Sequence, residues 1–134
     1  MNEVKERVFV IQPIESNNYR VLQEEAVALI ESANADYAGT VYQKIREVNP
    51  ATYIGEGKAE GIREMLTGLD VTVLFNGELS PSQTLNLSAA LDGRKVIDRT
   101  TLILDIFAMR AESSEGKIQV ELAQLKYLYP RLRG

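Results

Sequence analysis

The chain has 134 residues and a net charge of −4, with 45% hydrophobic and 25% charged residues and neither cysteine nor histidine. This length and composition predict one soluble globular domain; the two missing residue types exclude disulfides, zinc or haem ligation through Cys or His, and cysteine nucleophiles. No apolar run reaches the roughly 20 residues of a membrane span. The charged N-terminus also lacks the apolar core of a signal peptide, so we expect no membrane span and a cytoplasmic location.

The charge is divided unevenly along the chain. Residues 1–93 carry 7 Lys and Arg against 14 Asp and Glu, a balance of −7. Residues 94–134 carry 8 against 5, a balance of +3. An acidic body with a basic C-terminal segment indicates that the last third of the chain faces a negatively charged partner, although a solvated helix often carries such a balance too.

The first part of the chain predicts a strand, a helix and a second strand. Residues 7–14 are β-branched and apolar with little alternation, which is typical of a strand buried on both faces. A helix follows and closes in the breaker region 32–39, before a strand over residues 40–48. The helix is predicted from apolar residues at three- and four-residue spacing: Tyr19, Leu22, Ala26, Leu29, Ile30 and Ala33.

The middle of the chain continues this alternation. Its clearest local signal is at Ser80, an N-cap followed by Pro81 at the first helical position and by Gln83, which completes a capping box. Strands alternating with helices predict an α/β fold, a four-stranded and mostly parallel sheet with helices on both faces. The remaining elements are expected at residues 58–66 (helix), 71–76 (strand), 95–98 (strand) and 100–111 (helix).

The last segment has a different periodicity. Its apolar residues recur at alternating spacings of four and three, which is the pattern of a heptad seam. The seam either packs on this domain or pairs with a helix that lies elsewhere. Pro130 removes a hydrogen bond inside a helix, so we expect the helix to kink or stop near Tyr129. The residues of this seam are Ile118, Leu122, Leu125, Tyr129 and Leu132.

The turn Gly55-Glu56-Gly57-Lys58 resembles a phosphate-binding loop at a helix N-terminus. A P-loop, however, has four residues between its glycines and a hydroxyl after its lysine, whereas here one residue separates the glycines and Ala59 follows Lys58. The sequence therefore favours a tight turn that starts a helix, and Gly55, Gly57 and Lys58 are the candidates for nucleotide binding in the alternative interpretation.

Two aspartates near residue 100 are candidates for special roles. Asp98 lies where a strand becomes a helix, and the simplest interpretation is an N-cap. Asp105 lies between Leu104 and Ile106 in an apolar helix. It either faces solvent or pairs with one of two arginines, Arg99 or Arg110, between which the sequence does not choose.

The basic residues of the last segment alternate with aromatic residues. Lysine and arginine beside Tyr127 and Tyr129 are typical of contacts with a nucleic-acid backbone and stacking on its bases. A solvated helix face would carry the same charges. The candidates for RNA contact are Lys117, Lys126, Arg131 and Arg133.

Four stretches of the chain resemble the HflX family of ribosome-associated GTPases. They are TYIGEGKAEGI, ELSPSQTLNL, KVIDRTTLILDIFAMRA and EGKIQVELAQLKYLYPRLRG, in this order. The resemblance implies an N-terminal α/β domain at residues 1–112 and, at residues 113–134, the first arm of a helical hairpin. It further implies a longer parent protein, whose second helix pairs with the seam and whose G domain binds GTP and Mg²⁺. We accordingly expect no cofactor and no GTPase site within these residues.

The resemblance also implies a function. In the HflX family this region helps to dock the protein on the large ribosomal subunit and its RNA, modulates the GTPase, and belongs to a protein that splits or rescues ribosomes. Adenine-nucleotide binding by the same region of some members keeps the Gly55–Lys58 turn open as a small nucleotide site. A third interpretation is an interaction domain that dimerises through the exposed seam.

Overall fold

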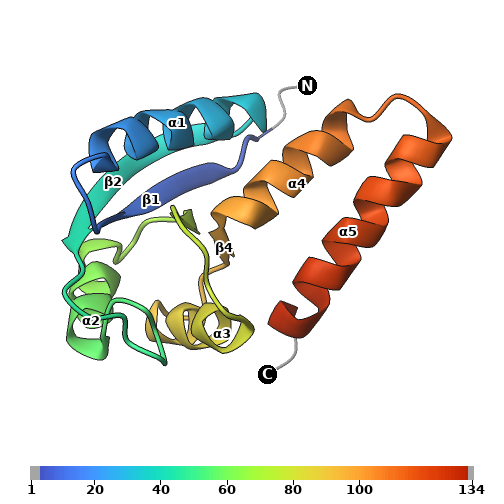
Figure 1. The fold of residues 1–134 in the computed structure, drawn as a ribbon. Helices are drawn as coiled ribbons and strands as arrows, with labels where there is room; N and C mark the ends of the chain where they lie inside the picture. Colours follow the sequence, from blue (N-terminus) through green and yellow to red (C-terminus); the bar gives the residue numbers. More distant parts are fainter. Residues whose placement is uncertain (1–3, 133–134) are drawn as a thin grey trace.

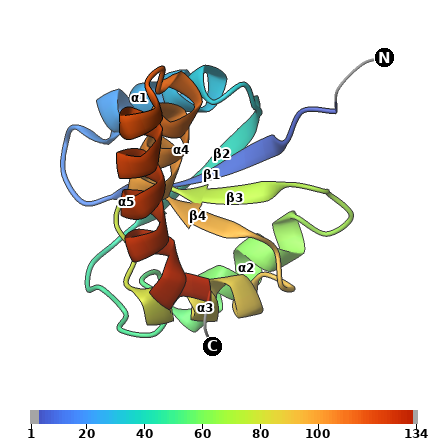
Figure 2. The same ribbon diagram turned by 90° about the vertical axis from the view of Figure 1, so that its right-hand side faces the viewer.

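The computed structural model describes residues 4–132 (Figure 1) and contains a parallel four-stranded sheet in the order β2-β1-β3-β4 (Figure 2). The predicted α/β fold is thereby confirmed, and every described strand pair is parallel. The strands are β1 (Arg7–Ile14), β2 (Asp36–Lys44), β3 (Thr72–Phe75) and β4 (Val96–Asp98). The helices are α1 (Tyr19–Ser32), α2 (Glu56–Met65), α3 (Pro81–Ala90), α4 (Arg99–Arg110) and α5 (Ser114–Leu132).

Helices cover both faces of the sheet, as predicted, and a separate core lies on each face (Figure 2). Side chains alternate between the two faces of a strand, so the unbroken apolar run of β1 supplies both cores. Phe9 and Ile11 pack with Phe75 beneath α2 and α3. Val8 and Val10 pack beneath α1 and α4 on the other face.

Strand β2 corrects the predicted position of the second strand. It begins at Asp36, inside the predicted breaker region, and ends at Lys44 instead of continuing to residue 48. The turn after α1 is short because Asn34 alone adopts a left-handed backbone, with φ 59°. Gly39, interpreted as part of a loop, instead lies in the strand at φ 132° beside a β-bulge and close to the ring of Phe9.

Helix α5 corrects the prediction that the helix ends or kinks near Tyr129. The helix includes Pro130 and continues to Leu132. Pro130 lies in the last turn, so few helical residues follow the hydrogen bond that it removes, and the Arg131 side chain donates to the Tyr127 carbonyl at 2.8 Å. Within residues 4–132, none of the helices has both the length and the apolar character to cross a membrane.

Two predicted caps are confirmed. The Ser80 hydroxyl accepts from the Gln83 amide, and the Gln83 side chain accepts in return from the Ser80 amide, so the capping box starts α3. Asp98 caps α4 by accepting from the Thr101 amide at 3.1 Å. α5 follows α4 after a short turn, which contains the predicted boundary at residues 112–113, and lies against α4 and α3 beyond β4 (Figure 1).

Candidate functional site

Helix α5 has two stripes with opposite roles. The seam faces away from the domain, and its five side chains are between 50% and 76% exposed. Of the two arrangements that the sequence left open, the structure therefore favours a seam that is not packed on this domain, although Leu132 at its end borders a cavity between α5 and β4. A second stripe is half-buried against α4 and α3, with Tyr127 reaching the end of β4, and consists of Val120, Gln124, Tyr127, Leu128 and Arg131.

The second stripe holds α5 mainly through the Asp98 carboxylate, at the end of β4. Asp98 is only 1% exposed. One of its oxygens accepts from the Leu79 amide at 3.1 Å and from the Tyr127 hydroxyl. The other accepts from the amide and the hydroxyl of Thr101. The predicted N-cap is thus also the point at which α3, α4 and α5 meet the edge of the sheet.

Burial, with the hydrogen bond to the Asp98 carboxylate as the next cause, raises the pKa of Tyr127 to about 12. A phenol whose pKa is higher in the folded than in the unfolded state stabilises the fold below pH 10, and this stabilisation is lost as the pH rises toward 12.

We therefore expect the stability difference between the wild-type chain and Tyr127→Phe to be constant up to pH 9 and to shrink between pH 10 and pH 12. Urea titrations across this range measure it. Tyr53, whose pKa burial also raises to about 12, is present in both chains, so its titration cancels. A difference that stays constant up to pH 12 contradicts the expectation.

The predicted RNA-contact residues lie in different settings. Lys117 and Lys126 are exposed on α5. The Arg131 guanidinium instead points into the domain: it donates to the Leu79 carbonyl at 2.8 Å and lies 3.6 Å from the centroid of the Tyr127 ring. Arg133 lies outside the described residues. Two of the four candidates are thus fully presented to a partner in this conformation.

Asp105 has a partner that the sequence did not predict. Its carboxylate accepts from the Gln124 side chain at 2.8 Å. Arg99, one of the two arginines considered for it, instead pairs with Glu25 at 2.6 Å. Burial raises the pKa of the Asp105 carboxyl, while the Gln124 hydrogen bond opposes the shift.

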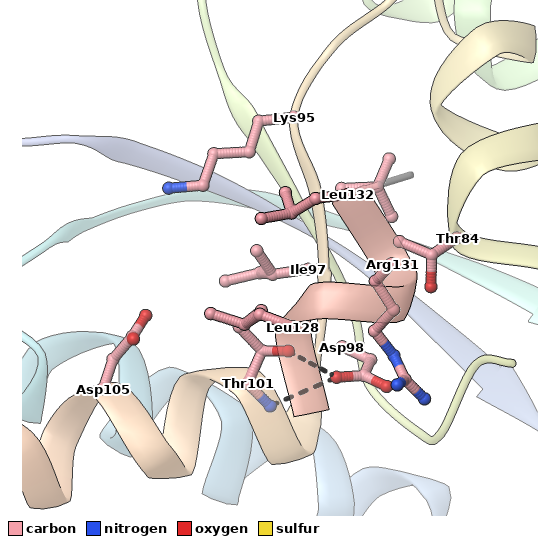
Figure 3. Close-up of a pocket in the computed structure, with 10 residues that line it drawn as sticks. Thr84, Lys95, Ile97, Asp98, Thr101, Asp105, Leu128, Arg131 and Leu132 are labelled. Atoms are coloured by element: carbon pink, nitrogen blue, oxygen red, sulfur yellow. Dashed lines mark hydrogen bonds between the residues drawn. The ribbon is translucent and has the colours of Figure 1, made fainter. Parts of the chain in front are cut away.

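A cavity of about 200 Å³ lies between Asp105, the outer edge of β4 and the end of α5 (Figure 3). Its walls are mostly apolar. Asp98 and Arg131 lie together on one side of it in this view, while Lys95 and Asp105 lie apart from them. The cavity is lined by Thr84, Lys95, Val96, Ile97, Asp98, Thr101, Asp105, Leu128, Arg131 and Leu132.

The Gly55–Lys58 turn has the local geometry that the tight-turn interpretation predicted. Gly55 is the N-cap of α2 at φ 93°, and Gly57 and Lys58 lie in the first helical turn. The Gly55 amide donates to the Thr52 hydroxyl at 3.0 Å. An open cavity of about 490 Å³ lies beside this turn, and Lys44, Arg46 and Lys58 are among its lining residues.

Tyr53 is a residue that the sequence analysis missed. It lies across the carboxyl ends of β1 and β3, where the strand order reverses and where open α/β sheets commonly bind ligands. Its ring centroid is 4.7 Å from that of Phe75, and its hydroxyl donates to Glu15 at 2.7 Å. Its φ of 71° is unusual for a bulky residue, but no local sequence signal marks it.

Comparison with known proteins agrees with this architecture. The family described as GTP-binding GTPase N-terminal matches residues 21–108, and the family described as GTP-binding GTPase Middle Region matches residues 110–134. The chain is similar to the GTPase HflX of Alkalihalophilus pseudofirmus, 50% identical over 83% of this chain and 27% of that protein, and to the GTPase HflX of Lacrimispora saccharolytica, 43% identical over the whole chain and 32% of that protein. The chain belongs to the HflX GTPase family.

A solved structure agrees with the HflX assignment at the level of fold. It is a GTP-binding protein of Sulfolobus solfataricus in complex with GDP, which matches 95% of this chain and 38% of its own with a TM-score of 0.71 and 30% identity. This HflX-family chain spans between a quarter and a third of the length of the curated relatives that it matches. The two family matches meet at residues 108–110, close to the end of α4.

Proposed function

We propose that this HflX N-terminal domain docks a GTPase of the relatives' length on the large ribosomal subunit and regulates its GTP hydrolysis. The proposal extends to the family's splitting or rescue of ribosomes in the cytoplasm. GTP and Mg²⁺ would be bound by the G domain of that longer protein, and this domain would itself be non-catalytic. The observation that carries the proposal is α5, which presents exposed lysines and an exposed apolar seam on one helix at the surface of the domain.

The lysines are the proposed contacts with ribosomal RNA. Because residues 1–93 carry a balance of −7, an RNA backbone would be repelled by most of the domain and attracted only toward the C-terminal segment. Lys117 and Lys126 are exposed there. Arg133 completes the proposed set, and Arg131 would join it if its guanidinium left the Leu79 carbonyl.

Reversing both lysine charges, in Lys117→Glu/Lys126→Glu, is expected to weaken binding of the full-length GTPase to purified large subunits. Each lost phosphate contact lowers the slope of log affinity against log salt by about 1, so the double variant should lower it by about 2. Co-sedimentation across a salt series measures both quantities. Lys5→Glu/Arg20→Glu is the matched control, since it changes net charge equally at exposed residues elsewhere; equal weakening in both variants contradicts the proposal.

The seam is proposed to pair with a second helix of the same full-length protein. Apolar side chains at heptad spacing are buried in coiled-coil pairs, and an isolated helix cannot bury them by itself. Were a second copy of this chain the partner instead, light scattering would find a dimer that Leu125→Glu dissociates.

A second candidate function is nucleotide binding at the Gly55–Lys58 turn. It is favoured by the open cavity that Lys58 shares with Lys44 and Arg46, at an α2 N-terminus whose dipole attracts anions. Calorimetric titration with ATP and GTP tests it, with Lys58→Ala against Lys5→Ala as control. Unchanged affinity in Lys58→Ala would reject this candidate.

A further inference from the structure

Helix α5 is attached to the domain by the polar contacts of one stripe and by the half-buried side chains of Val120 and Leu128. None of the described α5 residues is buried. The bonds that join it to the rest of the domain include those from Gln124 to Asp105, from Tyr127 to Asp98 and from Arg131 to the Leu79 carbonyl. A helix held in this way owes its orientation to a few directional bonds.

The Asp98 end of this attachment is rigid. The carboxylate sits at the last residue of β4 and is fixed by the backbone amides of Leu79 and Thr101 as well as by the Thr101 hydroxyl. A hydrogen bond in a buried setting is stronger than the same bond in water. The hydrogen bond from the Tyr127 hydroxyl to Asp98 therefore fixes the position of this part of α5 relative to the sheet.

Arg131 contacts the face of the Tyr127 ring. Its guanidinium carbon lies 3.6 Å from the Tyr127 ring centroid, within the range of a cation–π contact. One terminal nitrogen donates to the Tyr127 carbonyl and the other to the Leu79 carbonyl, both at 2.8 Å. Tyr127 is thus fixed at its hydroxyl by Asp98 and at its face by Arg131.

Apolar packing between α5 and β4 is incomplete next to these hydrogen bonds. The cavity of about 200 Å³ borders Asp98 and Arg131, between the outer edge of β4 and the end of α5 (Figure 3). Its apolar lining residues on α5, Leu128 and Leu132, leave this space between the helix and the sheet unfilled. Fewer dispersion contacts therefore oppose a movement of α5 at this end.

We propose that Asp98, Tyr127 and Arg131 form a polar latch that fixes the orientation of α5 and keeps the seam turned outward. Opening the latch frees α5 from the domain while the sheet and its two cores stay folded. The three residues are positioning residues. The inference goes beyond docking and regulation, and it holds whatever partner covers the seam.

Tyr127→Phe opens the latch with the least other change, since it removes one hydroxyl and leaves the Leu79 and Thr101 bonds to Asp98 in place. The chain has no cysteine, so Glu31→Cys on α1 and Glu121→Cys on α5 place one spin label on each part. Double electron–electron resonance then measures the distance between α1 and α5. Tyr42→Phe is the matched control, because it removes a hydroxyl from an exposed tyrosine far from α5.

The expected result is one narrow distance distribution in the wild-type chain and in Tyr42→Phe, and loss of that single distribution in Tyr127→Phe. The circular dichroism of Tyr127→Phe should remain close to that of the control, and its urea midpoint should fall by much less than that of Asp98→Ala. The proposal is overturned if Tyr127→Phe keeps the wild-type distance distribution. It is equally overturned if the variant loses as much global stability as Asp98→Ala, because the hydroxyl would then support the core and not the arm alone.

Discussion

Alanine in place of Asp98 is expected to destabilise the domain by about 3–5 kcal/mol, because it leaves several buried donors without an acceptor. The carboxylate is 1% exposed and accepts from two amides and two hydroxyls. The substitution also removes the N-cap of α4, which alone is worth about 1 kcal/mol. Three helices lose their common point of attachment to β4 at once.

Urea denaturation followed by circular dichroism measures the effect of Asp98→Ala. Asp70→Ala, at an exposed aspartate before β3, is the control and should stay within about 0.5 kcal/mol of the wild-type chain. A loss in Asp98→Ala no larger than in this control would contradict the role assigned to the carboxylate. Asp98→Asn should fall between the two, since it keeps the shape but places an amide NH₂ among donors.

Phe75→Ala is expected to cost about 3–5 kcal/mol, because it opens a large cavity in a core that relaxes only partly. Phe75 is fully buried at the end of β3, among the largest such side chains. Its ring packs against Tyr53 and against the backbone at Gly77, where an added Cβ would lie 2.9 Å from the ring. The loop that carries Tyr53 across the sheet edge should therefore loosen as well.

Phe107→Ala is the matched control for Phe75→Ala, since it removes the same side chain at a residue that is 57% exposed on α4. Thermal unfolding and hydrogen exchange of residues 49–55 measure the two parts of the expectation. Similar losses in both variants would contradict it. If the exchange rate of residues 49–55 is unchanged in Phe75→Ala, Phe75 stabilises the core but does not hold the loop of Tyr53 in place.

Much of the fold could be predicted because its signals are local. The apolar run of β1, the capping box at Ser80 and the cap at Asp98 each depend on a few neighbouring residues, and all three are confirmed. The start of β2 was missed because Asn34 and Gly39 look alike as loop formers. The pairing of β2 with β1 places Asn34 in the turn and Gly39 in the strand, and this pairing is not visible in the local sequence.

The site was harder to predict, because its contacts join residues that are distant in the sequence. The seam was visible as a heptad pattern, but the stripe that holds α5 to the domain is largely polar and has no apolar periodicity. Arg131 was therefore interpreted as a free cation, although its guanidinium meets the Leu79 carbonyl, 52 residues away. The Asp105–Gln124 bond was missed for the same reason.

The proposed pairing of the seam with a second helix predicts a specific loss of reactivity at Leu125. Leu125→Cys introduces a single thiol into the seam, and Gln119→Cys places one at an exposed residue outside it. Thiol modification rates are compared between the 134-residue chain, held monomeric by dilution, and a GTPase of the relatives' length that contains these residues and is freed of other cysteines. In the full-length protein the Leu125→Cys thiol should react at least about tenfold more slowly, because it is exposed only when the helix pair opens, while Gln119→Cys reacts alike in both. Equal rates for Leu125→Cys in the two proteins would contradict a seam that is covered by a second helix.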